Sequence, residues 1–185
     1  MTTIVGISGS LRRDSLNSAL LRAAVELVPA GTCLDVGDIS QIPLYNGDIE
    51  AESGSPEAVT RLQDQLADAD GILIVTPEYN ALMPGVLKNA VDWLSRPTEE
   101  IARVFGGKPV ALMGATMGGL GTMRAQQSWL PVLQAFRTRP WFGQQMLVSR
   151  AHELFGADGR LTDEPTRRRL ENYLREFVAF VDGQA

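Results

Sequence analysis

The regular alternation of short apolar runs with amphipathic stretches limits the fold more than any other feature of this chain. Thr3–Gly9, Cys33–Ile39, Gly71–Thr76 and Val110–Gly114 are each short and nearly continuously apolar. That pattern is typical of strands that a parallel sheet buries on both faces. We expect a fifth strand over Phe142–Val148.

The stretches between these runs have the periodicity of helices. Apolar residues recur on one helical face over Leu16–Leu27, Val59–Ala69, Val86–Ser95 and Leu170–Val181, which predicts helices that cover a sheet. Leu120–Phe136 is also helical in character.

Other segments interrupt the alternation. Ser40–Ser55 is rich in Gly, Pro, Asn and Ser, so we expect a loop there, and Pro56 falls where a first helical residue would stand.

Pro131 lacks the amide that would bond to Gln127, which predicts a kink or a restart of the helix expected over Leu120–Phe136. Cys33 is expected to be a small core residue.

Strand and helix alternate about five times, which indicates an α/β domain with helices on both faces of a parallel sheet. Five strands suit the three-layer α/β/α flavodoxin-like architecture with strand order 2-1-3-4-5. The 185 residues fit a single domain, 1–185, because no linker or internal repeat is visible.

Composition excludes several classes of function. The chain has 17 Lys+Arg against 22 Asp+Glu and a net charge of −5, which disfavours nucleic-acid binding. One cysteine and one histidine exclude an internal disulfide and a His-based metal site. The longest apolar runs fall far short of the roughly 20 residues that span a bilayer, and no signal peptide opens the chain. We therefore expect a cytoplasmic protein without membrane insertion.

The turn after the first predicted strand carries the features of an anion site. Ser10, Arg12, Ser15 and Asn17 surround the start of the first predicted helix, where unpaired backbone N–H groups and the helix dipole attract negative charge. Together these groups suit a phosphate monoester. The alternative is structural: Ser15 would only cap the helix, Ser10 would form a turn and Arg12 would be solvated. The turn matches neither GxGxxG nor a Walker A loop.

Two further strand ends are expected at the same edge of the sheet. Pro77–Asn80 combines a rigid start with an acid, an aromatic ring and an amide, which could border a planar ring. Gly114–Gly121 is rich in glycine, so its backbone could approach a ligand closely. A simple turn and a merely flexible loop remain the alternatives for these two segments.

Three motifs of the chain resemble the NADPH-dependent FMN reductase family, which includes flavodoxin-like quinone, chromate and azo-dye reductases. They are Gly9–Arg12 with Ser15–Asn17, Pro77–Asn80, and Pro84–Trp93, which reads PGVLKNAVDW. The resemblance covers roughly residues 4–124 and is strongest in the second and third motifs.

The resemblance implies an FMN cofactor, with NADPH or NADH as co-substrate. Hydride would pass to FMN and then to a quinone or another small oxidised acceptor (chromate, azo or nitro compound) in a ping-pong sequence. It also implies a homodimer or homotetramer. No catalytic acid, base or nucleophile is expected, because the cofactor supplies the chemistry, and His152 has no evident role. The implied cofactor-binding residues are Ser10, Leu11, Arg12, Ser15, Leu16, Asn17, Pro77, Glu78, Tyr79, Asn80, Ala115 and Gly118.

Other functions on the same fold remain open. The protein could be a flavodoxin-like electron carrier, although such carriers are usually more acidic, or a non-enzymatic FMN-binding protein. A phospho-receiver is disfavoured because it needs adjacent acids after the first strand, where this chain has Ser8–Ser10. NADPH turnover with a quinone separates the reductase from the carrier.

Overall fold

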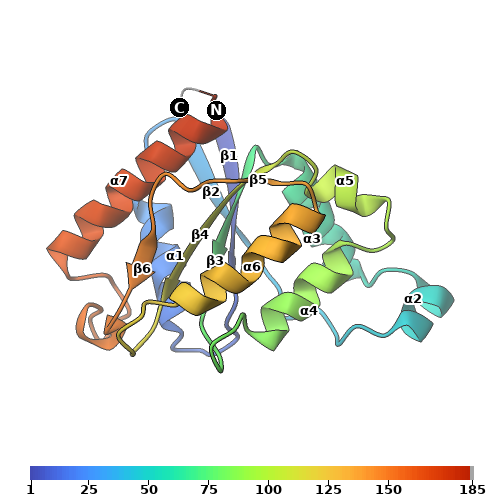
Figure 1. Ribbon diagram of the computed structural model, residues 1–185, viewed down its shortest axis with the longest axis horizontal. Coiled ribbons are helices and arrows are strands. Elements are labelled where there is room, and N and C mark those ends of the chain that lie inside the picture. The colour runs from blue at the N-terminus through green and yellow to red at the C-terminus, as the bar shows by residue number, and fades with distance from the viewer. Residues whose placement is uncertain (184–185) are drawn as a thin grey trace.

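The computed structural model describes residues 1–183 and has a parallel sheet at its centre (Figure 1). The strand order is β2-β1-β3-β4-β5, with β6 also paired to β4, and all pairs are parallel. The predicted fold class and strand order are therefore confirmed. The strands are β1 (Thr2–Ser8), β2 (Thr32–Gly37), β3 (Gly71–Val75), β4 (Pro109–Ala115), β5 (Arg139–Pro140) and β6 (Met146–Val148).

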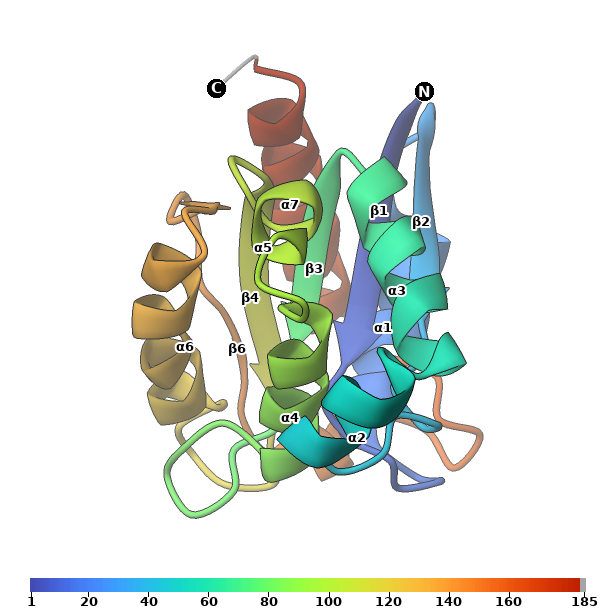
Figure 2. The same ribbon diagram turned by 90° about the vertical axis from the view of Figure 1, so that its right-hand side faces the viewer.

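Helices cover both faces of the sheet, as Figures 1 and 2 show. One face carries α1 and α7, and the other carries α3, α4 and α6. Each face has its own apolar core, as expected for a doubly wound sheet. The helices are α1 (Leu16–Leu27), α2 (Gly47–Ser53), α3 (Glu57–Asp68), α4 (Gly85–Leu94), α5 (Glu100–Val104), α6 (Met123–Ala135) and α7 (Glu164–Val181), with a short 3₁₀ helix, η1 (Ala151–Glu153).

The predicted fifth strand is split into two short pieces. Instead of one strand over Phe142–Val148, β5 pairs with the start of β4 and β6 pairs with its end. Between them Trp141 turns inward, with its ring centroid 4.9 Å from that of Tyr173 and 5.6 Å from that of Phe177. The Trp141 amide still donates to the Val110 carbonyl of β4 at 2.8 Å, so the chain leaves β4 only after Trp141. The backbone at Gly143 then packs against the indole ring, where a Cβ atom would lie 2.6 Å from Trp141 Nε1.

The segment Ser40–Ser55, predicted to be a loop, contains a helix, α2. No residue of α2 is buried, so it has no apolar periodicity to detect. Its attachment is polar: the Arg96 Nε donates to both carboxylate oxygens of Glu50 at 3.0 Å, and the Tyr45 hydroxyl donates to the same carboxylate at 2.8 Å. The five-residue α5 was also missed, because it is too short to show a pattern.

Helix α6 continues through Pro131 without the predicted restart. Pro131 and Gln127 are both exposed. The Gln127 carbonyl that Pro131 leaves without a helical partner can therefore be solvated, which lowers the cost of an internal proline.

Cys33 is half-buried rather than a core residue. It lies on β2, which forms one edge of the sheet, and its thiol donates to Asp35 Oδ1 at 3.2 Å. An edge strand has fewer neighbours to cover it than the central strands, which explains the wrong expectation.

Gly114 allows β4 to pack closely beside the end of β3. A Cβ atom at this position would overlap the Thr122 Oγ1 and the backbone oxygen of Thr76. Backbone atoms cannot swing aside as a flexible side chain can, so only glycine fits here.

We predict that Gly114→Ala lowers the free energy of unfolding by at least about 2 kcal/mol through overpacking. Gly119→Ala is the control, because a Cβ there would meet nothing within 4 Å. Urea unfolding of both variants tests this. Equal stability of Gly114→Ala and the wild type would show that the close approach is not required.

Candidate functional site

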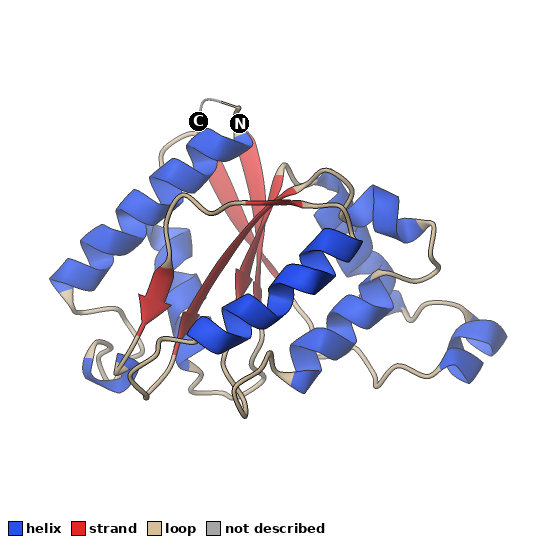
Figure 3. Ribbon diagram, viewed as in Figure 1, coloured by secondary structure: helices blue, strands red, loops and turns tan. Residues whose placement is uncertain are grey.

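A pocket of about 190 Å³ opens at the carboxyl end of the sheet. The chain leaves β1 for β2 on one side and returns to β3 on the other, so this is the switch in strand order where such folds bind ligands. Figure 3 shows the loops that gather beyond the strand arrowheads. The wall is formed by Ser10, Arg12, Ser15, Leu16, Asn17, Pro77, Glu78, Tyr79, Ala115, Thr116 and Met117.

The three segments predicted to converge do meet in this pocket. The wall contains every predicted site residue except Leu11, Asn80 and Gly118, which lie in the same segments but outside the wall. Thr116 and Met117 also lie in the wall. They fall inside the predicted loop between Ala115 and Gly118 but were not predicted individually, because only the glycines of that loop carried a sequence signal.

The start of α1 presents unpaired donors to the pocket wall. Ser15 is the N-cap of α1, and its hydroxyl oxygen accepts from the Ser18 amide at 3.2 Å. The amides of Leu16 and Asn17, the first two of the helix, have no acceptor among residues 1–183. Ser10 and Ser15 are buried, yet each hydroxyl keeps a hydrogen to donate. These groups together form a cradle of donors.

Asn17 ties this cradle to the end of β4. Its side-chain Nδ2 donates to the Ala115 carbonyl at 2.9 Å, and its Oδ1 accepts from the Ala115 amide at 2.8 Å. Asn17 is 5% exposed, so both bonds are shielded from water. The pairing leaves one N–H of the side chain for a ligand, and its main role is to hold two walls of the pocket together.

Gly9 brings the first turn against the loop after β3. A Cβ atom here would lie 2.7 Å from Leu87 Cδ2 and 2.8 Å from Pro77 Cδ. These distances are shorter than real Cβ contacts. The first turn and the loop after β3 can therefore come this close only because glycine has no side chain.

The loop after β3 forms a tight turn at the pocket mouth. The Tyr79 amide donates to the Leu82 carbonyl at 3.0 Å, and the Leu82 amide donates back at 3.1 Å. Asn80 and Ala81 have φ values of 51° and 66°, the signature of a type I′ turn. Tyr79 remains 45% exposed, so its ring presents apolar surface beside the opening.

The Glu78 carboxylate is directed to α6. Its Oε2 accepts from the backbone amides of Arg124 at 3.0 Å and of Ala125 at 3.2 Å. From the sequence, Glu78 was predicted only as part of the loop that borders a ligand. Its side-chain bonds with α6 could not be found from sequence, because the residues are 46 and 47 positions apart.

The charges around the pocket favour an anion. Arg12 is exposed and forms no ion pair within the part of the chain that the structure describes. The acid on the wall, Glu78, has its carboxylate hydrogen-bonded to backbone amides of α6. The positive end of the α1 dipole adds to the Arg12 charge, so the cradle combines positive potential with donors.

Among residues 1–183 we looked for a catalytic histidine, a metal site and a membrane-spanning helix. His152 lies exposed in η1, 3.6 Å from Glu153, outside the wall of this pocket. No group of three or more potential metal-ligating side chains occurs in this range, and none of its helices has the length and apolarity to cross a membrane.

Comparison with known proteins gives one consistent match. Residues 2–153 match the family model described as NADPH-dependent FMN reductase. The chain is 45% identical to an NAD(P)H-dependent FMN reductase of Pseudomonas aeruginosa, covering 96% of this chain and 94% of that protein. It is 41% identical to a 2-hydroxy-1,4-benzoquinone reductase of a Burkholderia species, with 96% and 95% covered.

A solved structure agrees with these relatives. The flavoenzyme NAD(P)H:(acceptor) oxidoreductase FerB of Paracoccus denitrificans superposes with a TM-score of 0.88 at 33% identity, covering 100% of this chain and 99% of that one. A family model that spans most of the chain, together with relatives similar over nearly their whole length, settles the assignment. This protein belongs to the NADPH-dependent FMN reductase family.

Proposed function

We propose that this protein is an FMN-dependent NAD(P)H oxidoreductase that reduces a quinone. Family membership makes it a reductase with FMN as cofactor and NAD(P)H as co-substrate. We assign the FMN phosphate to the cradle at the start of α1. The observation that carries this assignment is the pair of unpartnered amides of Leu16 and Asn17 beside two buried hydroxyls and the free Arg12.

The chemistry of the cradle fits a phosphate dianion. Amide N–H, hydroxyl and guanidinium groups are all donors, and a phosphate monoester offers three acceptor oxygens. Each charge-assisted bond contributes about 1.5–3 kcal/mol. Several such bonds are enough to hold a cofactor through repeated turnovers.

The opposite end of the pocket suits the flavin ring. We assign the ring to the space between the loop at Pro77–Tyr79 and the loop at Ala115–Met117. Asn80 and Gly118 follow these two loops directly in the chain. Leu11 follows Ser10 on the phosphate side. The exposed Tyr79 offers apolar surface to a ring or to a substrate stacked on it.

We assign binding and orientation of the cofactor to the residues of the wall, and no acid or base step to any of them. When bound, FMN would accept a hydride from NAD(P)H and pass it to an oxidised acceptor. The hydroxyls and amides of the cradle fix one end of the cofactor. The open mouth beside Tyr79 admits the reductant and then the acceptor in turn, which is a ping-pong sequence.

A quinone is the acceptor that the relatives favour. Proteins named quinone reductase include one from Escherichia coli, 43% identical over 96% of this chain. Chromate, azo and nitro compounds are secondary candidates for the same open mouth. A homodimer or homotetramer in the cytoplasm, where NAD(P)H is produced, completes the proposal.

The electron-carrier alternative fits the pocket less well. A carrier has no need to bind nicotinamide, whereas the relatives named above are NAD(P)H-dependent or quinone reductases. The charged residues on the pocket wall are Arg12 and Glu78, and this wall lacks the acidic rim that carriers use to dock partners.

We predict that Arg12→Glu weakens FMN binding by roughly 10- to 100-fold, because it removes one charge-assisted bond and places a negative charge beside the phosphate. The dissociation constant follows from quenching of FMN fluorescence by the apoprotein. Arg175→Glu, an exposed arginine of α7 outside the pocket wall, makes the same charge change and should leave the affinity unchanged. Equal FMN affinity in the wild type and Arg12→Glu would remove Arg12 from the site.

We also predict that steady-state oxidation of NADPH with benzoquinone gives parallel lines in a double-reciprocal plot. Parallel lines are expected when reductant and acceptor occupy the same mouth in turn. Intersecting lines would mean that both substrates bind together, and no oxidation of NADPH or NADH would contradict the reductase assignment.

A further inference from the structure

Helix α6 has no N-cap of its own. The residue that precedes it, Thr122, has a left-handed backbone with φ of 67°, and its side chain makes no capping hydrogen bond. The first amides of a helix lack intrahelical partners and normally require a nearby side-chain acceptor. The start of α6 therefore depends on a group from elsewhere in the chain.

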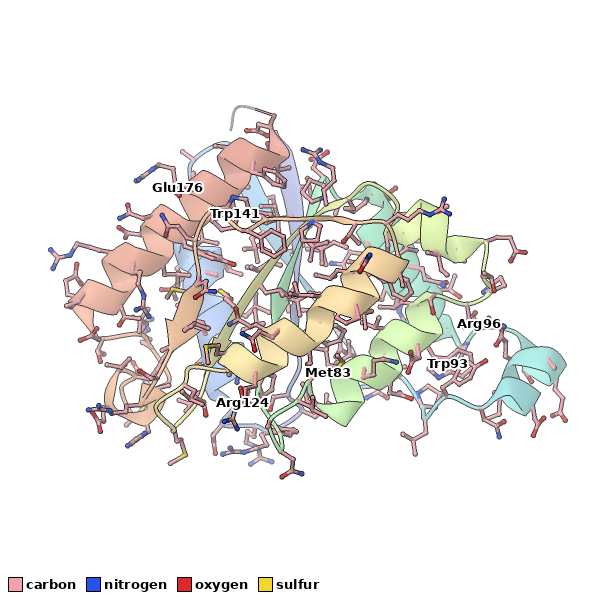
Figure 4. The ribbon with its side chains drawn as sticks, viewed as in Figure 1. Met83, Trp93, Arg96, Arg124, Trp141 and Glu176 are labelled. Carbon is pink, nitrogen blue, oxygen red and sulfur yellow. The ribbon has the colours of Figure 1, made fainter. Side chains whose placement is uncertain are left out.

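Glu78 supplies this cap from the pocket loop. Its Oε2 accepts from the amides of Arg124 and Ala125, which are the second and third residues of α6 and the ones that an N-cap side chain serves. A carboxylate also interacts favourably with the positive end of the helix dipole. Figure 4 labels Arg124 in the first turn of α6 and Met83 in the loop between β3 and α4.

The same loop is attached to α6 at its other end. The Met83 amide donates to the Ser128 Oγ at 3.1 Å, and Ser128 lies about one turn beyond the residues that Glu78 caps. Between the two attachments the turn over Tyr79–Leu82 projects outward, with Tyr79 45% and Leu82 59% exposed. Because the exposed turn has little packing of its own, its position depends on these attachments.

We propose that Glu78 is a positioning residue for the cofactor: its carboxylate fixes the Pro77–Tyr79 wall to the first turn of α6 and thereby sets the shape of the ring end of the pocket. This inference rests on the proposed function, since it assumes that FMN occupies the pocket. Glu78 acts through hydrogen bonds with backbone amides and donates no proton to a substrate.

Two substitutions separate positioning from a general loss of stability. Glu78→Ala removes the acceptor. Glu78→Gln keeps an oxygen that can accept from both amides and removes the charge. The matched control is Asp163→Ala, because Asp163 is the N-cap of α7, accepts from the Thr166 amide at 2.9 Å and lies outside the pocket wall.

FMN affinity of the apoproteins, visible circular dichroism of the bound flavin and thermal unfolding are measured for the wild type and all three variants. Glu78→Ala and Asp163→Ala should each lower Tm by about 2–4 °C, as expected for a lost cap in a chain of this size. Glu78→Ala alone should weaken FMN binding at least about tenfold and change the dichroism of the flavin. Glu78→Gln should stay within about threefold of the wild-type affinity.

Each contrary result has a separate meaning. Wild-type FMN affinity and dichroism in Glu78→Ala, despite its lower Tm, would overturn the inference and leave the proposed function intact. Loss of FMN affinity in Glu78→Gln equal to that in Glu78→Ala would also overturn it, because the charge and not the cap would then be required. A wild-type protein that binds no FMN would contradict the proposed function itself.

Discussion

The ligand-binding pocket depends on the unpaired donors at the start of α1. A helix that begins immediately beyond a buried parallel strand exposes its first amides at the edge of the sheet, and here Ser15 satisfies only the amide of Ser18. Strand β3 lies beside β1 on the side opposite β2, so the loop after β3 borders the same space. Those amides therefore border a pocket that the side chains of residues 1–183 leave open, which is the reason for assigning an anionic ligand to it.

The remainder of the pocket is held in place before any ligand binds. Asn17 joins the first turn to the end of β4, Gly9 allows the first turn to touch Pro77, and Glu78 joins that loop to α6. Walls fixed in this way need little ordering when a cofactor binds, so less binding free energy is lost to entropy. The mouth of the pocket is different, because the turn that carries Tyr79 is exposed; under the proposed function this is where planar substrates would enter.

The sequence predicted the architecture and most of the pocket wall, and it failed where long-range packing decides the outcome. The strands over Thr3–Gly9 and Gly71–Thr76 are apolar enough to identify, and their order places the loops that follow them together. Nothing local distinguishes the roles of Asn17 and Glu78, because their partners lie 98 and 46 residues away. The interruption of the last strand after Trp141 likewise accompanies long-range packing, because the Trp141 ring lies against Tyr173 and Phe177 of α7.

The most direct test compares binding of FMN and riboflavin to the apoprotein. The two ligands share the flavin ring and the ribityl chain, so the difference in their affinities isolates the phosphate. If the donors at the start of α1 hold that phosphate, FMN should bind at least about 100-fold more tightly than riboflavin, as the loss of two or more charge-assisted bonds requires. Equal affinity for the two ligands would contradict the account.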